Sequence, residues 1–153
     1  MTKAAPLHTI GYEQTPAAAV LDELARARVD LLVDVRAIAS SRRPGFSKRQ
    51  LAAGLDERGI KYLHLRGLGT PKEGRLAARA GNIDRLFDIY EKHLATTQAR
   101  EELDELTLLA RSGQRLCLLC YERDATRCHR RWIAERIHER TGAQVDHLMA
   151  APA

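Results

Sequence analysis

The 153-residue sequence predicts an α/β protein: a three-layer domain with a mostly parallel sheet of about five strands and helices on both faces. Short apolar runs recur along the chain, and segments with the apolar spacing of helices separate most of them. Residues 31–35 are apolar on both faces at their start, as expected for a strand inside a covered parallel sheet. This length predicts one domain, residues 1–153.

The first half of the chain is expected to supply three strands and two helices. The strands are predicted at residues 7–11, 31–35 and 60–65. Thr15 and Pro16 have the residue types of a helix N-cap and a first helical position. Ser47 and Gln50 have the spacing of a capping box, and they predict the start of a second helix that ends at Gly59.

The second half is predicted to alternate in the same way. Residues 66–74 are rich in glycine and predict a loop. Residues 82 to about 110 have helical apolar spacing, which residues 95–98 can divide into two helices. A fourth strand at residues 116–121, a helix over about 126–141 that ends at Gly142, and an edge strand at 145–148 complete the sheet.

Ionisable side chains stand at the ends of four of these strands. In chain order they are Glu13, then Asp34 with Arg36, then His64, then Cys120 with Glu122. Right-handed crossovers bring the carboxyl ends of parallel strands to one edge of the sheet. The sequence therefore predicts a ligand cleft at that edge.

The acidic residues at these strand ends have structural alternatives. Asp34 ends a strand that should be buried, where an unpaired carboxylate is costly, and this favours a site role over an ion pair with Arg36 or a helix cap. Glu122 shares a strand face with Cys120, so it is either a site residue or a solvated turn residue. The same two alternatives hold for Glu13.

Two basic segments are candidates for holding an anion. Four arginines crowd the turn after the fourth strand: Arg123, Arg127, Arg130 and Arg131. The free N–H groups of the helix predicted to begin there also attract an anion. The second segment, residues 40–49, includes Arg42 and either clamps phosphate groups from the other side of the cleft or is a solvated charge run.

Cysteine and histidine near this turn allow several chemistries. Cys117 should be a core thiol, since it points away from Cys120 along the strand. Cys128 is expected in the first helical turn, either as a stabilised thiolate or packed on a neighbour. His129 should face the cleft, as an acid–base or ligand-binding group. Zinc at Cys120, Cys128 and His129 is possible but not favoured, because no fourth ligand is evident.

Composition limits the class of protein. The net charge of +5 suits an anionic partner, either a small molecule or a nucleic acid, and the few aromatic residues argue against a platform for stacking single strands. There is no phosphate loop, dinucleotide fingerprint or zinc-protease motif. No apolar stretch is long enough for a membrane, and three cysteines without a signal peptide favour reduced thiols in the cytoplasm.

Five sequence blocks occur in order along nearly the whole chain: residues 9–13, 32–36, 41–47, 68–73, and 119–122 with 128–130. Together they closely resemble the "domain of unknown function 488" family of bacterial and archaeal proteins. Gln14 stands where this family often has a glycine after the glutamate. The resemblance implies a three-layer α/β domain with a site formed by these blocks, and it implies no particular reaction.

These observations predict a cytoplasmic hydrolase or group transferase that acts on a phosphate-bearing substrate, a nucleotide or nucleic acid. Asp34 and Glu122 are expected as general bases or electrostatic groups and His129 as their acid–base partner, with Glu13 as a further catalytic candidate. Cys120 is either a nucleophile or a wall residue. The groups expected to hold the anion are Arg36, Arg42, Arg127, Arg130 and His64.

Two other classes of protein remain open. One is a non-catalytic nucleic-acid-binding module. The other is a cysteine enzyme, because a strand-end cysteine that leads into a helix looks like the cradle of sulfurtransferases and phosphatases, where a small glycine-rich loop wraps the anion. The loop after Cys120 has no glycine and contains Glu122 and Asp124, which would repel an anion. The sequence makes no prediction of oligomeric state.

Overall fold

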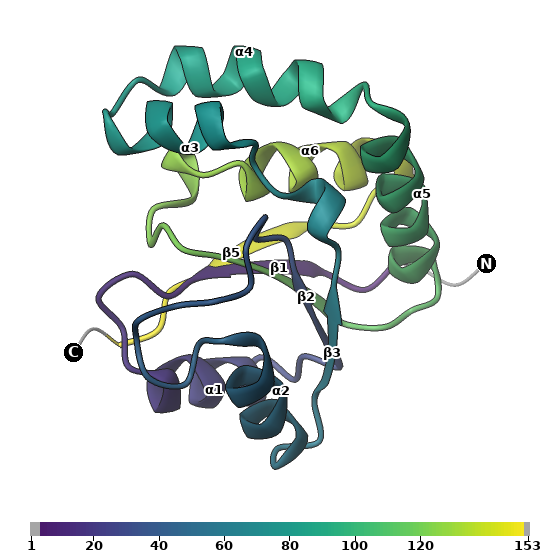
Figure 1. Cartoon of the computed structure of the whole chain (residues 1–153). Helices are drawn as coiled ribbons and strands as arrows, with labels where there is room; N and C mark the ends of the chain where they lie inside the picture. Colours follow the sequence, from purple (N-terminus) through teal and green to yellow (C-terminus); the bar gives the residue numbers. More distant parts are fainter. Residues whose placement is uncertain (1–3, 152–153) are drawn as a thin grey trace.

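A computed structural model describes residues 4–151 and contains a five-stranded parallel sheet between two layers of helices (Figure 1). The strands are β1 (Leu7–Gly11), β2 (Leu31–Asp34), β3 (Lys61–His64), β4 (Leu116–Cys120) and β5 (Val145–Leu148). Their order is β3-β2-β4-β1-β5, and every neighbouring pair is parallel. The predicted fold class and all five predicted strands are confirmed.

The helices divide unequally between the two faces of the sheet. Below the sheet in Figure 1 lie α1 (Ala17–Arg26) and α2 (Lys48–Asp56). Above it lie α3 (Lys72–Arg79), α4 (Ile83–Leu94), α5 (Thr97–Arg111) and α6 (Arg130–Thr141). The predicted division near residues 95–98 is confirmed, since α4 ends at Leu94 and Thr96 caps α5.

Strand alternation separates the interior into two hydrophobic cores. On β4, Leu116 and Leu118 pack with the larger helical layer, whereas Cys117 and Leu119 pack with α1 and α2. Side chains at successive strand positions point to opposite faces, so a fully apolar strand is what a sheet covered on both sides requires. Cys117 is fully buried, which confirms the expected core thiol, and burial raises the pKa of its thiol well above the usual range.

Two predicted helix starts are wrong in detail, and the start of α2 at its N-cap Ser47 is confirmed without the predicted capping bond. Pro16 is the N-cap of α1, and the Thr15 hydroxyl donates instead to the Glu13 carbonyl. The Ser47 hydroxyl pairs with the backbone of Ser41 and makes no cap bond, so the capping box does not form. A short 3₁₀ turn, η2 (Ala125–Arg127), intervenes before α6, which begins at Arg130 rather than near residue 126.

The predicted loop over residues 66–74 is also partly wrong. Residues Arg66–Leu68 form the 3₁₀ turn η1, and α3 begins at Lys72 and includes Gly74. A Cβ at Gly74 would lie 2.5 Å from Thr70 Cγ2 and 3.4 Å from Leu86 on α4. The glycine therefore leaves room mainly for the Thr70 side chain, four residues earlier, and it lies inside a helix although glycine is a usual loop signal.

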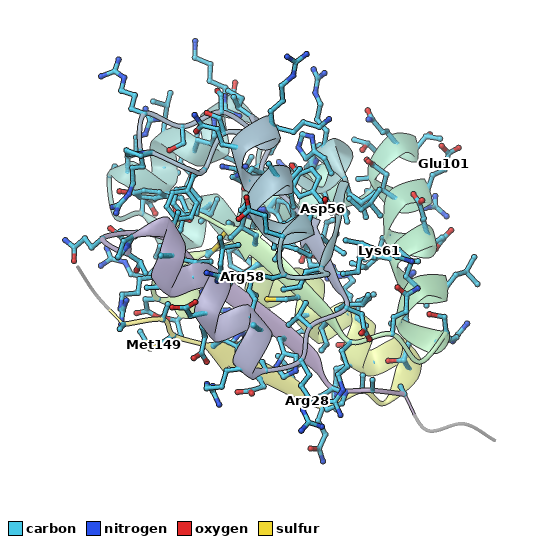
Figure 2. All side chains as sticks on the ribbon, turned by 90° about the horizontal axis from the view of Figure 1, so that it is seen from below. Arg28, Asp56, Arg58, Lys61, Glu101 and Met149 are labelled. Atoms are coloured by element: carbon cyan, nitrogen blue, oxygen red, sulfur yellow. A yellow bond between two sulfur atoms is a disulfide. The ribbon has the colours of Figure 1, made fainter. Side chains whose placement is uncertain are left out.

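Charged side chains cover the outside of the molecule. Figure 2 shows the charged residues Arg28 and Glu101 at its periphery, and both are exposed. Within residues 4–151, none of the helices has both the length and the apolar character that crossing a membrane requires.

Candidate functional site

A cleft of about 730 Å³ opens at the carboxyl edge of the sheet, beside the ends of β1, β2 and β4. On the left of Figure 1, the loop after β4 lies below α3, and both contribute residues to this cleft. Six of the residues predicted for the site line it: Glu13, Arg36, Cys120, Glu122, Arg127 and His129. The parallel topology brings these groups together from distant parts of the chain.

The loops after β1 and β4 are held tightly against each other. A Cβ at Gly11 would lie only 1.7 Å from the Glu122 carbonyl oxygen, so only glycine allows this approach. The Glu13 carboxylate accepts the backbone N–H of Arg123 at 3.1 Å. Gln14, where the family often has glycine, has a left-handed φ of 57°. Glu13 thus points into the cleft from a constrained turn.

Asp34 and Arg36 form a buried ion pair behind the cleft wall. Arg36 donates from Nε to Asp34 Oδ1 at 2.9 Å and from Nη2 to Oδ2 at 2.7 Å, and Tyr62 donates to the same Oδ2 at 2.5 Å. Burial alone would lower the pKa of Arg36, but the hydrogen bonds and charge of Asp34 raise it above its usual value. Asp34 itself is fully buried and does not line the cleft.

The same guanidinium is fixed on its other side. Arg36 Nη1 donates to the Phe46 carbonyl at 2.8 Å and lies 3.3 Å from the Tyr12 hydroxyl. The Tyr12 and Phe46 rings stack with centroids 4.3 Å apart. These contacts fix the position of Arg36 at the wall of the cleft, where Asp34 balances its charge.

Arg130 is a second buried arginine, and its hydrogen-bond partners are neutral groups. Its donors reach Thr9 Oγ1 at 3.1 Å, Cys120 Sγ at 3.0 Å and the Glu122 and Arg123 carbonyls. No carboxylate in residues 4–151 forms an ion pair with it. Burial lowers the pKa of Arg130 to about 10. Its charge therefore lies next to the sulfur of Cys120, beneath the floor of the cleft.

Glu122 is the acid closest to this sulfur. Its Oε2 lies 3.7 Å from Cys120 Sγ, as their shared strand face predicted. The side chain is half-buried, and burial raises the pKa of its carboxyl above the usual range. A carboxyl with this shift retains its proton to higher pH than a solvated one, which suits a general acid.

His129 is buried and lies on the wall of the cleft. Its Nε2 lies 2.7 Å from the Val35 carbonyl, which only accepts, so Nε2 carries the proton. Its Nδ1 then presents a lone pair toward Cys128 Sγ, 3.7 Å away. Burial lowers the pKa of His129 to about 4, although the hydrogen bond to Val35 opposes the shift. The imidazole is therefore neutral at physiological pH.

Cys120 and Cys128 are joined as a disulfide, in contrast to the reduced thiols expected from the sequence, and their Cα atoms are 7.5 Å apart. Cys128 follows η2 in extended backbone and is not in the first turn of α6. Donor atoms of Cys120, Cys128 and His129 all lie within 4.8 Å of one another. We call these three buried residues the thiol–imidazole cluster.

The wall opposite β4 is basic and was not predicted. Arg75 and Arg79 lie one helical turn apart on α3 and line the cleft with Arg127. Arg127 Nη2 reaches the α3–α4 junction, where it would lie 3.6 Å from a Cβ at Gly81. A signal was present in the sequence, since a proline followed by an acidic residue, here Pro71 and Glu73, is typical of a helix start.

Four predicted site residues are not among those lining the cleft: Asp34, Arg42, His64 and Arg130. Asp34 and Arg130 lie behind its surface, as described above. His64 Nε2 lies 2.7 Å from the Arg36 carbonyl, so the imidazole supports the backbone of the β2 exit. Arg42 is exposed on the loop before α2, whereas its neighbour Arg43 binds the Thr15 carbonyl at 2.7 Å.

Comparison with known proteins agrees with the resemblance of the sequence blocks. The sequence model of the "Domain of unknown function DUF488" family matches residues 16–137, and the chain belongs to this family. No curated protein and no solved structure matches the chain significantly.

Proposed function

We propose that this protein is a hydrolase or group transferase that acts on a phosphate-bearing substrate, a nucleotide or a nucleic acid. The function of its family is unassigned. One observation supports the proposal most: the cleft combines a fixed arginine, Arg36, and three further arginines with Glu122, a half-buried acid of raised pKa. Arginine forks match phosphate oxygens, and a protonated carboxyl beside them can protonate a leaving oxygen.

The size and walls of the cleft suit a nucleotide. About 730 Å³ is within the range of small-molecule sites. Tyr121 lines it, is 45% exposed and rests edge-on against Tyr12, so it offers a ring for a base. The phosphates would lie between Arg36 and the three arginines Arg75, Arg79 and Arg127.

The acid–base roles follow from the environment of each group. In hydrolysis, a water oxygen bonds to phosphorus as the bond to the leaving oxygen breaks. Glu122 donates its proton to the leaving oxygen and recovers one from the attacking water. The bonds of Asp34 to Arg36 and Tyr62 assign it a positioning role through Arg36. His129, being neutral with Nε2 occupied, is assigned no proton transfer.

A cysteine enzyme is the second candidate. It is favoured by the Arg130 guanidinium 3.0 Å from Cys120 Sγ, because a neighbouring positive charge favours a reactive thiolate once the pair is reduced. It ranks lower because residues 121–127 contain no glycine and offer no small backbone cradle for an anion.

The test combines binding and turnover with nucleoside diphosphates, nucleoside triphosphates and single-stranded oligonucleotides. Glu122→Gln should abolish most turnover and retain affinity, because it keeps the side-chain shape but cannot transfer the proton. Arg79→Ser should weaken binding by roughly tenfold or more, the loss expected for one charge-assisted hydrogen bond. Arg100→Ser, an exposed arginine on α5, is the matched control and should change neither quantity.

Two outcomes would contradict the proposal. If ligands bind but no reaction occurs with any substrate, the protein is a binding module. If none of these anions binds, or if Arg79→Ser and Arg100→Ser behave alike, the cleft is not a phosphate site.

A further inference from the structure

We propose that the thiol–imidazole cluster, once its cysteines are reduced, binds one thiophilic divalent cation of the zinc class through Cys120 Sγ, Cys128 Sγ and His129 Nδ1. The three donor atoms lie within 4.8 Å of one another and all three residues are buried. Two thiolates and one imidazole form a set that zinc commonly accepts, with the fourth position left for water.

The imidazole is already oriented for this role. The Nε2 proton is held by the Val35 carbonyl at 2.7 Å, so Nδ1 is free of a proton and directed at the cysteine pair. Histidines that bind metals usually donate their second ring N–H to a carbonyl or carboxylate, which fixes the tautomer and the ring. The Tyr90 ring packs edge-on against the imidazole, with centroids 5.2 Å apart, and restricts it further.

The surroundings of Cys120 favour an anionic sulfur. Arg130 is fully buried, is not ion-paired within residues 4–151 and donates to Cys120 Sγ at 3.0 Å. A buried guanidinium is stabilised by an adjacent negative group, which a thiolate supplies and a disulfide sulfur does not. Two thiolates would neutralise a dication, so binding adds no net charge to the buried site.

The backbone positions of the two cysteines also agree with a shared metal. Their Cα atoms are 7.5 Å apart, beyond the range of about 4.4–6.8 Å usual for disulfides. An ion between the sulfurs allows a wider separation. Loading begins with two-electron reduction of the S–S bond by a phosphine and one water: the water supplies the oxygen of the phosphine oxide and the protons of the two thiols. The cation then displaces two thiol protons, with no further electron transfer.

The fourth position would face the cleft. Cys120, Cys128 and His129 all contribute to its lining, and Glu122 Oε2 lies 3.7 Å from Cys120 Sγ. A cation bound there would hold a water beside the proposed phosphate site and lower the pKa of that water. This use of the metal rests on the proposed function, whereas metal binding itself does not.

The test is an anaerobic titration of the phosphine-reduced, metal-free protein with Co²⁺. We expect one equivalent to produce a thiolate-to-cobalt charge-transfer band and the intense visible bands of tetrahedral cobalt, both removed by one equivalent of Zn²⁺. Cys120→Ser and Cys128→Ser should weaken binding more than about a hundredfold, beyond the loss typical of an outer-shell change. His129→Gln should alter the visible bands. Cys117→Ser, on the same strand, is the matched control and should behave as the unmodified protein.

A second measurement uses the unmodified protein, so it tests metal binding even if a serine variant does not fold. Zn²⁺ should protect Cys120 and Cys128 of the reduced protein from alkylation, read by mass spectrometry. The proposal is overturned if cobalt gives no charge-transfer band, if the serine variants bind as well as the original, or if zinc gives no protection. Metal binding without turnover would reject the proposed function alone, and turnover without metal binding would reject this inference alone.

Discussion

Arg36 and Arg130 are both buried at the carboxyl end of the sheet, but their guanidinium groups have different partners. Arg36 binds both oxygens of Asp34, and these interactions raise its pKa above the usual value despite burial. Arg130 binds a hydroxyl, a sulfur and two carbonyls, and burial lowers its pKa to about 10. One positive charge is balanced within the fold, and the other is available to stabilise a thiolate.

Arg36 and Arg130 therefore have different roles, although both are buried arginines. The Asp34 pair makes Arg36 a fixed part of the cleft wall, at the cost of burying a carboxylate. Arg130 keeps an unbalanced charge below Cys120, which is costly for stability and useful only if an anion forms there. Breaking each arrangement should therefore affect different properties.

The largest effect is expected when the Arg36 pair is broken. Asp34→Ala should lower the free energy of unfolding by about 3–5 kcal/mol, because it leaves a buried guanidinium without its counter-charge. Denaturant unfolding measures this loss. The double variant Asp34→Leu with Arg36→Met should lose less than Asp34→Ala, since it removes both charges. A loss under about 1 kcal/mol for Asp34→Ala would show that the pair is not structural.

An intermediate effect is expected from pH, because burial lowers the pKa of His129 and the charge of Arg130 adds to the lowering. The folded value of about 4 is below the ordinary 6.5, so the unfolded chain binds more protons in this interval. The stability of the disulfide-bonded protein should be complete above pH 6.5 and fall by roughly 3 kcal/mol as the pH approaches 4. Urea midpoints across this interval measure it.

The matched variant for this prediction is His129→Gln, which does not titrate. Its stability should lack the part of the acid loss that belongs to His129, while losses from carboxylates remain in both proteins. Equal slopes of stability against pH in the two proteins would mean that His129 is not buried as a neutral imidazole.

The smallest change in stability is expected at Arg130. Arg130→Met should cost about 1–3 kcal/mol, because it leaves the Glu122 and Arg123 carbonyls without donors but also removes an unbalanced buried charge. In the reduced protein, alkylation of Cys120 should slow about tenfold, equivalent to roughly 1.4 kcal/mol of lost thiolate stabilisation. Mass spectrometry of labelled peptides checks this, with Arg100→Met as the control. If Arg130→Met lost more stability than Asp34→Ala, Arg130 rather than Arg36 would be the arginine that the fold depends on most.

Local signals predicted most of the fold. The apolar run of β4 and the helix end at Gly142, which has a left-handed φ of 74°, depend on neighbouring residues and were predicted correctly. The start of helix α3 was missed because Gly74 lies within the helix and makes room for the Thr70 side chain, whereas glycines in this stretch predicted a loop. The start of α6 was misplaced because the Asp124 side chain caps η2, which ends the turn before the helix begins.

The sequence predicted part of the candidate site. Strand alternation and parallel topology were enough to expect Glu13, Arg36, Cys120 and Glu122 at one cleft. The basic wall on α3 was not expected, because a loop was predicted for residues 66–74 and no element for residues 75–81, where Arg75 and Arg79 lie.

The sequence by itself determined that acidic, thiol and guanidinium groups converge at one edge of a parallel sheet, because alternation along strands and the direction of crossovers are local and topological rules. Only the tertiary structure decided which arginine is paired and which is not. Arg130 reaches Thr9 across 121 positions of the chain, and Arg36 reaches Tyr12 across 24. Such partners are set by packing between distant segments, and burial then determines what each charge can do.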